Sequence, residues 1–249
     1  MSSGTINLIS DLSALLVRPI GRGSLDEILF QLDVLHTFCK EGISVINTPV
    51  AIERAVDKYR ALELLKSAGV AVPATVVTES VNEAVQAFKE FGGEAIVKPV
   101  YGSRGIGAAR ISDPDVAERV FRTLRFYRHV IYIQQFIPHG NSDMRAFVIK
   151  DDVVAAMKRE SRSWKTNVSQ GARPVGVSLS DELCKMVVKA TRVLGCEIAG
   201  VDVMEGDQGF VVNEVNSQPG WRGLQSTTNT DIAGKIADYV ISQAATRVP

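Results

Sequence analysis

The chain has 249 residues, of which 45% are hydrophobic, enough to bury the core of one large domain or two smaller ones. Lysine and arginine together number 28, as do aspartate and glutamate, so the formal net charge is zero. Without a net field of either sign, the chain is not expected to bind nucleic acid or an anionic membrane, and small molecules are the expected partners.

No apolar run approaches the roughly 18 residues of a membrane span, and the N-terminal segment lacks the charged start and apolar stretch of a signal peptide. The three cysteines, Cys39, Cys184 and Cys196, have no metal-ligand spacing and are typical of buried thiols in a reducing compartment. The sequence therefore predicts a soluble protein of the cytoplasm.

Helical periodicity and strand-like runs alternate along the chain, and internal repeats are absent. In chain order, the patterns predict a helix over 25–41, a strand over 43–46, a helix over 57–68, a strand over 75–78, a helix over 81–91, strands over 95–99 and 107–111, a helix over 114–126, strands over 131–136, 144–149 and 153–157, a helix over 181–194, strands over 197–204 and 209–215, and a helix over 231–244. This order favours α+β or α/β layers over a bundle or a sandwich.

Local turn and cap signals refine these elements. Turn residues at 150–152 and 206–207 predict hairpins between the strands that flank them. Ser80 with Glu83 predicts a capping box, and Ser180 predicts a side-chain cap for the helix that follows it.

Three oxygen-bearing side chains, Asp202, Glu214 and Asn216, lie on two expected strands joined by a turn at residues 206–209. Because residues two apart on a strand point to the same face, Glu214 and Asn216 project together, and the turn brings Asp202 beside them. Mg²⁺ prefers oxygen ligands at about 2.0 to 2.1 Å and shares them with substrate phosphates. These residues predict a Mg²⁺ or Mn²⁺ site. The alternative is an acidic edge on a surface hairpin.

A glycine-rich loop joins the expected strands 95–99 and 107–111. Its glycines permit positive φ and a close approach of the backbone to phosphates, and a lysine at the end of the first strand supplies a cation. No helix follows the loop, so the dinucleotide-binding motif of strand, loop and helix does not fit. The alternative is a structural hairpin with an exposed lysine. The expected phosphate-binding residues are Lys98, Gly102, Ser103, Arg104 and Gly105.

In this order the motifs resemble those of the ATP-grasp superfamily, and in detail its RimK-like carboxylate-amine ligases, from about residue 45 to 240. Residues 54–58 are similar to the family's helix-opening segment with a first ATP-contacting lysine, here Lys58, and Lys98 matches the second lysine. Residues 132–149 resemble the hinge that meets the adenine edge. The nucleotide-contacting residues implied for this hinge are Gln134, Gln135, Phe136, Ile137 and Asp143.

The resemblance continues to the C-terminal part of the chain. Residues 164–172 resemble the segment that places an asparagine, here Asn167, near phosphate and metal, and residues 220–236 resemble the closing helix. It implies an α+β ATP-grasp fold, in which two α/β subdomains grip ATP between antiparallel sheets. The expected division is a shortened N-terminal domain at 1–50, a lid subdomain at 51–127 and a metal-binding subdomain at 128–249.

The chemistry that the resemblance implies is ATP-dependent amide formation through an acyl phosphate, with release of ADP and phosphate. Because phosphoryl transfer depends chiefly on positioning and charge neutralisation, the site needs cations around the γ-phosphate, here Lys58, Lys98 and Mg²⁺. The planar forks of Arg145, Arg159 and Arg222 are expected to steady the acyl phosphate or its oxyanion.

The substrates implied are ATP, an amino acid, foremost L-glutamate, and a carboxylate-bearing acceptor. The acceptor expected is a small coenzyme such as a pterin or a deazaflavin, with protein tails or carrier proteins as alternatives. Relatives carry a fuller N-terminal domain, so a homo-oligomer is expected, and Arg18 and Arg22 lie on a loop where an acidic acceptor could bind. The competing hypothesis is a non-catalytic nucleotide-binding regulatory or scaffold subunit.

Overall fold

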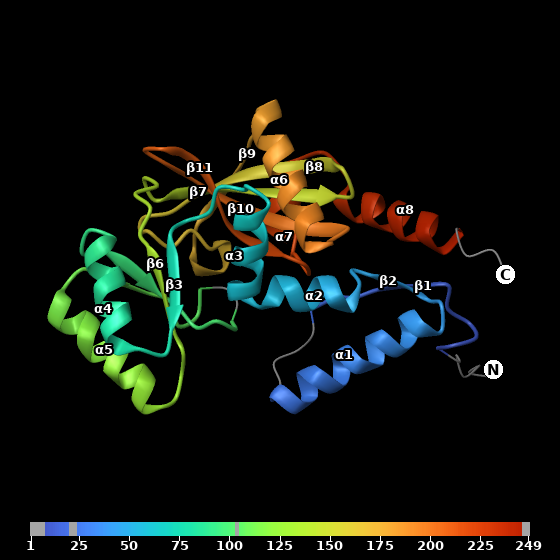
Figure 1. Cartoon of the computed structure of the whole chain (residues 1–249). Coiled ribbons are helices and arrows are strands. Elements are labelled where there is room, and N and C mark those ends of the chain that lie inside the picture. Colours follow the sequence, from blue (N-terminus) through green and yellow to red (C-terminus); the bar gives the residue numbers. More distant parts are fainter. Residues whose placement is uncertain (1–7, 20–23, 103–104, 246–249) are drawn as a thin grey trace.

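The computed structural model describes residues 8–19, 24–102 and 105–245. Ser103 and Arg104 of the expected phosphate-binding loop, and Arg22, lie outside these residues. The described chain forms a two-stranded, a four-stranded and a five-stranded sheet, with helices packed against each (Figure 1). This arrangement confirms the expected α+β architecture.

The N-terminal unit consists of β1 (Ala14–Leu16), α1 (Leu25–Lys40) and β2 (Ser44–Ile46). The two strands pair in parallel, which requires a crossover connection, and α1 supplies it. Ser24 begins α1 with a reciprocal capping box, since its side chain accepts from the Glu27 backbone while the Glu27 carboxylate accepts from the Ser24 backbone. The sequence does not predict β1.

The four-stranded sheet has the order β3-β6-β4-β5, and α4 and α5 pack together against it. Its core contains Phe88 and Phe121 from the helices and Ile131 and Ile133 from the central strand β6. The elements are β3 (Thr75–Thr78), α4 (Val81–Glu90), β4 (Ala95–Val97), β5 (Ala109–Ile111), α5 (Pro114–Phe126) and β6 (Ile131–Gln135).

The five-stranded sheet has the order β11-β10-β7-β8-β9 and is antiparallel throughout. Both expected hairpins are present, because Ile149 lies opposite Asp152 and Gly206 lies opposite Gly209. The edge strand β9 follows the short 3₁₀ turn Val168–Gln170, and the sequence predicts neither. The strands are β7 (Ser142–Ile149), β8 (Asp152–Glu160), β9 (Arg173–Gly176), β10 (Ile198–Gly206) and β11 (Gly209–Asn216).

One face of the five-stranded sheet is covered by α2 (Pro49–Val56), α3 (Lys58–Ser67) and α6 (Asp181–Leu194). Leu65 of α3 and Val187 of α6 are buried in its core. The apolar faces of α2 and α3 therefore pack onto the C-terminal sheet. The sequence places α3 in the lid segment 51–127, and it does not predict α2, which spans residue 51. Strand β6 conversely pairs with the lid strands β3 and β4. The expected domain boundaries at residues 51 and 127 therefore do not divide the chain between the two large sheets. Helix α2 spans the first boundary, and the pairing of β6 with β3 and β4 crosses the second.

The other face of this sheet packs against α7 (Arg222–Gln225) and α8 (Ile232–Ala245). Phe147 and Ile232 are fully buried in this layer. Of these two helices the sequence predicts only α8, because a four-residue helix has too few residues to show a 3.6-residue period. Within the described part of the chain, no helix is both long and apolar enough to cross a membrane.

Asn47 connects the N-terminal unit to the five-stranded sheet. Its side-chain nitrogen donates to the carbonyl oxygens of Ile198, at 2.7 Å, and Ser217, at 2.5 Å. Its side-chain oxygen accepts from the backbone nitrogens of Glu197, at 2.6 Å, and Ile198, at 2.9 Å. The amide is 2% exposed, so each of its hydrogen-bonding positions is occupied by backbone from the start of β10 or from the end of β11.

The cap signals are confirmed in part. Ser180 accepts from the Leu183 backbone, as expected. Ser80 also accepts from the Glu83 backbone, but the expected reciprocal bond is wrong, because the Glu83 carboxylate accepts from the Thr78 hydroxyl, which in turn accepts from the Ser80 backbone. An intervening threonine thus replaces the direct contact of a capping box.

Candidate functional site

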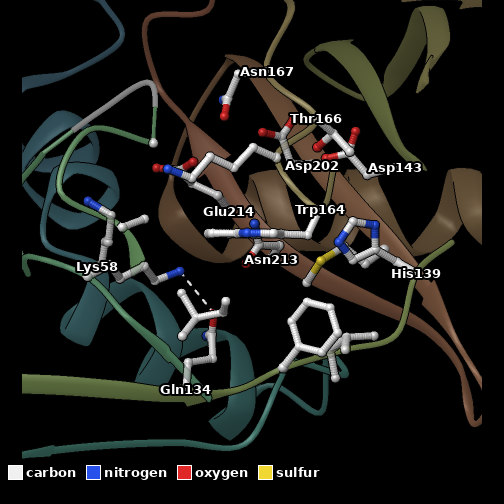
Figure 2. A pocket seen from close by; sticks show the side chains of 18 of the residues that line it. Lys58, Gln134, His139, Asp143, Trp164, Thr166, Asn167, Asp202, Asn213 and Glu214 are labelled. Carbon is white, nitrogen blue, oxygen red and sulfur yellow. Dashed lines mark hydrogen bonds between the residues drawn. The ribbon is translucent and has the colours of Figure 1, made fainter. Parts of the chain in front are cut away.

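A pocket lies between the four-stranded and the five-stranded sheets, and it brings together most of the side chains that the sequence singled out (Figure 2). They come from α3, the glycine loop, β6 and the hinge after it, β7, β8, β10 and β11. The expected residues that line the pocket are Lys58, Lys98, Gly102, Gly105, Gln134, Gln135, Phe136, Ile137, Asp143, Arg159, Asn167, Asp202 and Glu214.

Lys98 follows β4 and is anchored by the neighbouring central strand. Its Nζ donates to the side-chain oxygen of Gln134 at 3.0 Å and lies 5.2 Å from the Tyr132 ring centroid. Gln134 is 2% exposed and in turn donates to the Thr75 hydroxyl, so its oxygen is held toward the lysine. Burial lowers the pKa of Lys98 from 10.5 to about 8, against the opposing effect of the Glu214 carboxylate. A phosphate placed beside Lys98 would restore its charge.

Lys58 opens α3 and contacts the glycine loop. Its Nζ donates to the carbonyl oxygens of Val100, at 3.2 Å, and Gly102, at 2.6 Å, and burial lowers its pKa. Gly105 has φ +69°, and a Cβ on it would lie 2.8 Å from the Asn167 side-chain oxygen. Positive φ and this close approach explain why glycine occupies the position. The loop therefore lies between Lys58 on one side and Asn167 on the other.

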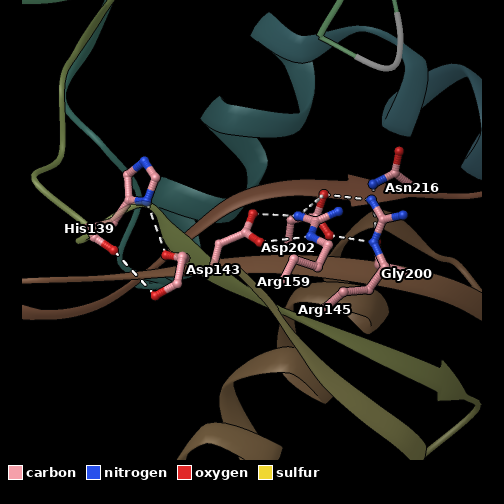
Figure 3. Close-up of polar contacts among 8 residues, drawn as sticks. His139, Asp143, Arg145, Arg159, Gly200, Asp202 and Asn216 are labelled. Carbon is pink, nitrogen blue, oxygen red and sulfur yellow. Dashed lines mark hydrogen bonds and ion pairs between the residues drawn. The ribbon is translucent and has the colours of Figure 1, made fainter. Parts of the chain in front are cut away.

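Three buried charged side chains and the partly buried Arg145 form a row across β8, β7 and β10 (Figure 3). Arg159 donates from both Nε and Nη2 to the Asp143 carboxylate, and its Nη2 lies 3.1 Å from an Asp202 carboxylate oxygen. Arg145 donates to the same Asp202 carboxylate from Nε and Nη2, at 2.6 Å each. Burial acts to raise the pKa of Asp202, but Arg145 and Arg159 outweigh it and hold that pKa below its ordinary value. Burial raises the pKa of Asp143 despite its bond to Arg159.

These contacts indicate different roles for Arg145 and Arg159, both of which the sequence assigned to the reacting phosphate. The Arg159 side chain is 3% exposed and occupied by two carboxylates, so it holds Asp143 and Asp202 in place. Burial acts to lower the pKa of Arg159, but Asp202 and Asp143 outweigh it and raise that pKa above its ordinary value. The Arg145 side chain is 18% exposed and stands at the open end of the row. A direct role in catalysis stays a prediction for both arginines, because Arg145 is the more exposed of the two whereas Arg159 is the one that lines the pocket.

The expected metal ligands Asp202 and Glu214 lie directly opposite each other on β10 and β11. The register then shifts, because Val203 pairs with Val212 and Asn213 is left as an extra residue in β11. Such a bulge turns a side chain away from strict alternation, and both Asn213 and Glu214 line the pocket as a result. Alternation alone predicts that Asn213 faces away from Glu214, which is why the sequence analysis missed it.

The donor set at this point suits a hard cation. Asp202 and Glu214 offer carboxylate oxygens, and the Asn216 nitrogen donates to the Gly200 carbonyl at 3.3 Å, which leaves its side-chain oxygen for a ligand. Across residues 8–19, 24–102 and 105–245, no three His, Cys, Asp or Glu side chains gather into a cage that could hold a metal. A cation here would therefore take part of its coordination from the substrate phosphates, as Mg²⁺ usually does.

Three expected residues do not line the pocket. Arg145 donates to the Asp202 carboxylate, and Asn216 donates to the Gly200 carbonyl. Arg222 is exposed on α7, next to Trp221. The structure therefore does not bring Arg222 to Lys58 and Lys98, although the sequence analysis grouped it with the arginines that steady the acyl phosphate.

The pocket also has lining residues that the sequence analysis did not assign to it. Trp164 lies across its middle in Figure 2, with Glu214 and Asn167 on one side and Gln134 on the other. His139, interpreted from sequence as structural, is 8% exposed, and its Nδ1 donates to the Ser142 carbonyl at 3.0 Å. The sequence left open whether Trp164 lines a substrate pocket, and the residues that it did not assign are Ile96, Pro99, Ile106, Ala108, His139, Lys165, Thr166, Met204 and Asn213.

The arrangement can bind a polyphosphate and neutralise its charge. Two lysines from different elements reach one pocket, a loop of backbone groups lies beside them, and two carboxylates stand opposite. Apolar groups of Ile96, Phe136 and Met204 line the same space and suit a planar base.

Residues 55–240 match the RimK-like ATP-grasp domain. Among curated proteins, the tetrahydromethanopterin:alpha-L-glutamate ligase of Methanosarcina acetivorans is 33% identical over 263 residues, which cover 94% of this chain and 81% of that protein. The enzyme of the same name from Methanocaldococcus jannaschii is 37% identical over 242 residues, with the same coverage of 94% and 81%.

Solved structures show the same fold. A RimK domain ATP-grasp protein from Sphaerobacter thermophilus superposes with a TM-score of 0.73 at 23% identity, over 93% of this chain and 83% of that chain. The ATP-grasp ligase PsnB, complexed with a minimal precursor, gives a TM-score of 0.71 at 26% identity, over 88% of this chain and 70% of that chain.

Proposed function

Because this chain belongs to the RimK-like ATP-grasp family and is an ATP-dependent carboxylate-amine ligase, we propose that it joins L-glutamate to a carboxylate of a pterin coenzyme. The observation that carries the proposal is the convergence of Lys58, Lys98, Asp202 and Glu214 in one pocket, from segments far apart in the sequence. The curated relatives that share most of this chain bear the names of glutamate ligases acting on a pterin.

The chemistry needs two steps, because a carboxylate at neutral pH has no leaving group. The acceptor carboxylate attacks the γ-phosphate of ATP, which forms an acyl phosphate and releases ADP. The glutamate amine then attacks the acyl carbon, which forms the amide and expels phosphate. In both steps negative charge shifts from one oxygen to another, so cations held in fixed positions contribute most of the stabilisation of the transition state.

The chain supplies such cations as two lysines and two arginines. Lys98 and Lys58 have pKa values lowered by burial, and phosphate oxygens would hold both as cations. Arg145 neutralises Asp202 and is the arginine that we propose to contact the acyl phosphate, while Arg159 positions the carboxylates of Asp143 and Asp202. A bound Mg²⁺ or Mn²⁺ would be held by Asp202, Glu214 and Asn216 and would neutralise charge on the transferred phosphate.

The competing hypothesis of a non-catalytic subunit is not favoured. A protein that only binds nucleotide has no need of two opposed carboxylates, and here both line the pocket beside the lysines. The relatives named above are ligases.

We also propose that the enzyme is a cytoplasmic homo-oligomer. The cysteines Cys39, Cys184 and Cys196 are all free, which fits a reducing compartment. The apolar side chains of Leu29 and Phe30 are 51% and 68% exposed on α1, which fits a covered surface in an assembly. Light scattering of the purified protein tests the assembly.

The function is tested by incubating the purified protein with ATP, Mg²⁺, L-glutamate and tetrahydromethanopterin. ADP release is followed, and mass spectrometry is used to look for a pterin that has gained a glutamyl unit. Such a product, absent when Glu214→Gln replaces the native protein, is expected. ADP release that requires another amino acid or another acceptor would overturn the substrate assignment.

A further inference from the structure

A second group of side chains adjoins Asp202 outside the nucleotide pocket. A Cβ on Gly200 would lie 2.9 Å from the Pro219 ring and 3.8 Å from Nε of Arg145, so these two residues approach each other over Gly200. Arg145 binds the Asp202 carboxylate with the same Nε. The loop that contains Pro219 therefore lies near the open end of the charged row.

Arg18 reaches this loop from the N-terminal unit, 201 positions away in the sequence. Its Nη1 donates to the Pro219 carbonyl at 3.4 Å, and its Cζ lies 4.3 Å from the centroid of the Trp221 ring. Trp221 in turn packs edge-on against the buried Phe147, with ring centroids 6.1 Å apart. A fixed indole thus orients the guanidinium, and stacking of this kind leaves the edges of the fork available for hydrogen bonds.

The guanidinium groups of Arg18 and Arg222 have no ion-pair partner among the described residues. Both side chains are exposed. Arg119, Arg122 and Arg125, on the lid helix α5, are each paired with a carboxylate by contrast. Unpaired guanidinium groups beside a phosphate-transfer site favour an anionic ligand with a carboxylate.

The shape of the group points to the larger of the two organic substrates. Arg18 is exposed, and Trp221 is only partly buried, so the group forms an open shelf at the surface. A small amino acid needs enclosure to be recognised, whereas an elongated acceptor needs only its reacting end to be held while the rest lies outside. Arg18 also lies outside the matched domain 55–240.

We infer that Arg18 and Trp221 form the binding shelf for the carboxylate-bearing end of the acceptor, which they hold beside Arg145. The inference rests on the proposed ligase function and adds the acceptor side of the same site. Arg18 acts as a binding residue, and Trp221 acts as a positioning residue through Arg18.

The two tryptophans of the chain allow this shelf to be observed separately from the nucleotide pocket. Trp164 lines the pocket and Trp221 lies under Arg18, so in a Trp164→Phe background the emission comes from Trp221 alone. This variant is titrated with glutarate, a colourless dicarboxylate, in the presence of ADP and Mg²⁺. We expect a saturable change in Trp221 emission, and Arg18→Gln in the same background should raise its midpoint at least about tenfold, as loss of a charge-assisted hydrogen bond predicts.

The matched control is Arg122→Gln, which removes an exposed guanidinium from the outer face of α5, paired with Glu118. It should leave the glutarate midpoint unchanged. Thermal melting followed by circular dichroism verifies that Arg18→Gln is folded. An emission that does not respond to glutarate, or a midpoint that is the same with and without Arg18, would show that the inference is wrong.

Steady-state kinetics with the full substrate set separate the acceptor from the amino acid. Arg18→Gln should raise the KM for tetrahydromethanopterin by about tenfold and leave the KM values for ATP and glutamate within about twofold. A rise in the glutamate KM instead would overturn the assignment to the acceptor. If the native protein forms no glutamyl pterin, the proposed function falls, and the fluorescence titration still decides whether Arg18 binds a carboxylate.

Discussion

Arg145 donates two hydrogen bonds of 2.6 Å to the carboxylate of Asp202, one from Nε and one from Nη2. A carboxylate that is expected to bind a metal is thus already held by a cation, and Arg159 holds it from the opposite side at 3.1 Å. The charges of Arg145 and Arg159 balance those of Asp143 and Asp202 within the row. The orientation of Asp202 is therefore set before any nucleotide binds, which is the kind of support that functional carboxylates need.

The difference in burial between the two arginines predicts different effects of their loss. Arg159→Gln leaves Asp143 and Asp202 buried without their shared cation, and we expect it to lower the free energy of unfolding by about 3 to 5 kcal/mol. Arg145→Gln, at a side chain that is 18% exposed, should cost less stability but abolish most turnover. Urea denaturation and ADP release measured on both variants check this. Equal losses of stability would contradict the division of roles.

The lowered pKa of Lys98 predicts that nucleotide binding depends on pH. Above a pH of about 8 the unliganded Lys98 is increasingly neutral, so phosphate must bring in a proton. The affinity for ADP should fall by up to about tenfold per pH unit above pH 8. Calorimetry in two buffers of different ionisation enthalpy at pH 8.5 should show proton uptake, and Lys98→Met should show none. An affinity that stays constant up to pH 10 would contradict the assignment.

The same pKa shift has a consequence for stability. Between pH 8 and the ordinary pKa of 10.5, the unfolded chain binds a proton at Lys98 that the folded chain does not, so this lysine makes the free energy of unfolding rise with pH in that window. Native protein and Lys98→Met should therefore differ in slope there, which denaturation at pH 7.5 and pH 9.5 measures. Parallel slopes would show that Lys98 titrates normally.

Glu214 is expected to bind the metal and also to support the charge of Lys98. Its carboxylate raises the pKa of Lys98 against the effect of burial. Glu214→Gln should therefore weaken Mn²⁺ binding in the presence of ADP by at least about tenfold and move the pH midpoint of ADP binding downward. Electron paramagnetic resonance titration of Mn²⁺ needs no turnover and measures the first effect. Glu205→Gln, at an exposed glutamate of the same hairpin, is the control and should change neither.

The buried hydrogen bonds of Asn47 predict that replacing this residue destabilises the fold of β10 and β11. Asn47→Asp keeps the shape and the two accepted bonds but loses both donors, and it places a carboxylate against the carbonyl oxygens of Ile198 and Ser217. We expect a loss of at least about 3 kcal/mol in the free energy of unfolding, since a charged group would be left buried and unsatisfied. Chemical denaturation measures it, with Asn229→Asp in an exposed loop as the control. A loss below about 1 kcal/mol would contradict this role.

Much of the local structure is determined by the sequence alone, because it depends on neighbouring residues. The 3.6-residue period predicts α5 and α6 with the bounds found, and the period of two predicts β3 likewise. The tight turn between Gly206 and Gly209 fixes the hairpin register as far as Val203 and Val212 and brings the two carboxylate-bearing segments together, although only the bulge after it places Glu214 opposite Asp202. The glycine loop follows a similar local rule, since only glycine readily adopts φ +69° at residue 105.

The tertiary structure decided what depends on residues far apart in the sequence. Arg145 and Arg159 are indistinguishable as isolated arginines, and only the order β10-β7-β8 places Asp202 between them and buries Arg159 more deeply. Asn213 reaches the pocket through a bulge that alternation does not predict. Arg18 meets Trp221 only because the N-terminal unit packs beside the loop after β11. Residue type sets the chemistry a side chain can perform, but burial and charged neighbours, which come from packing, set whether it can reach a substrate.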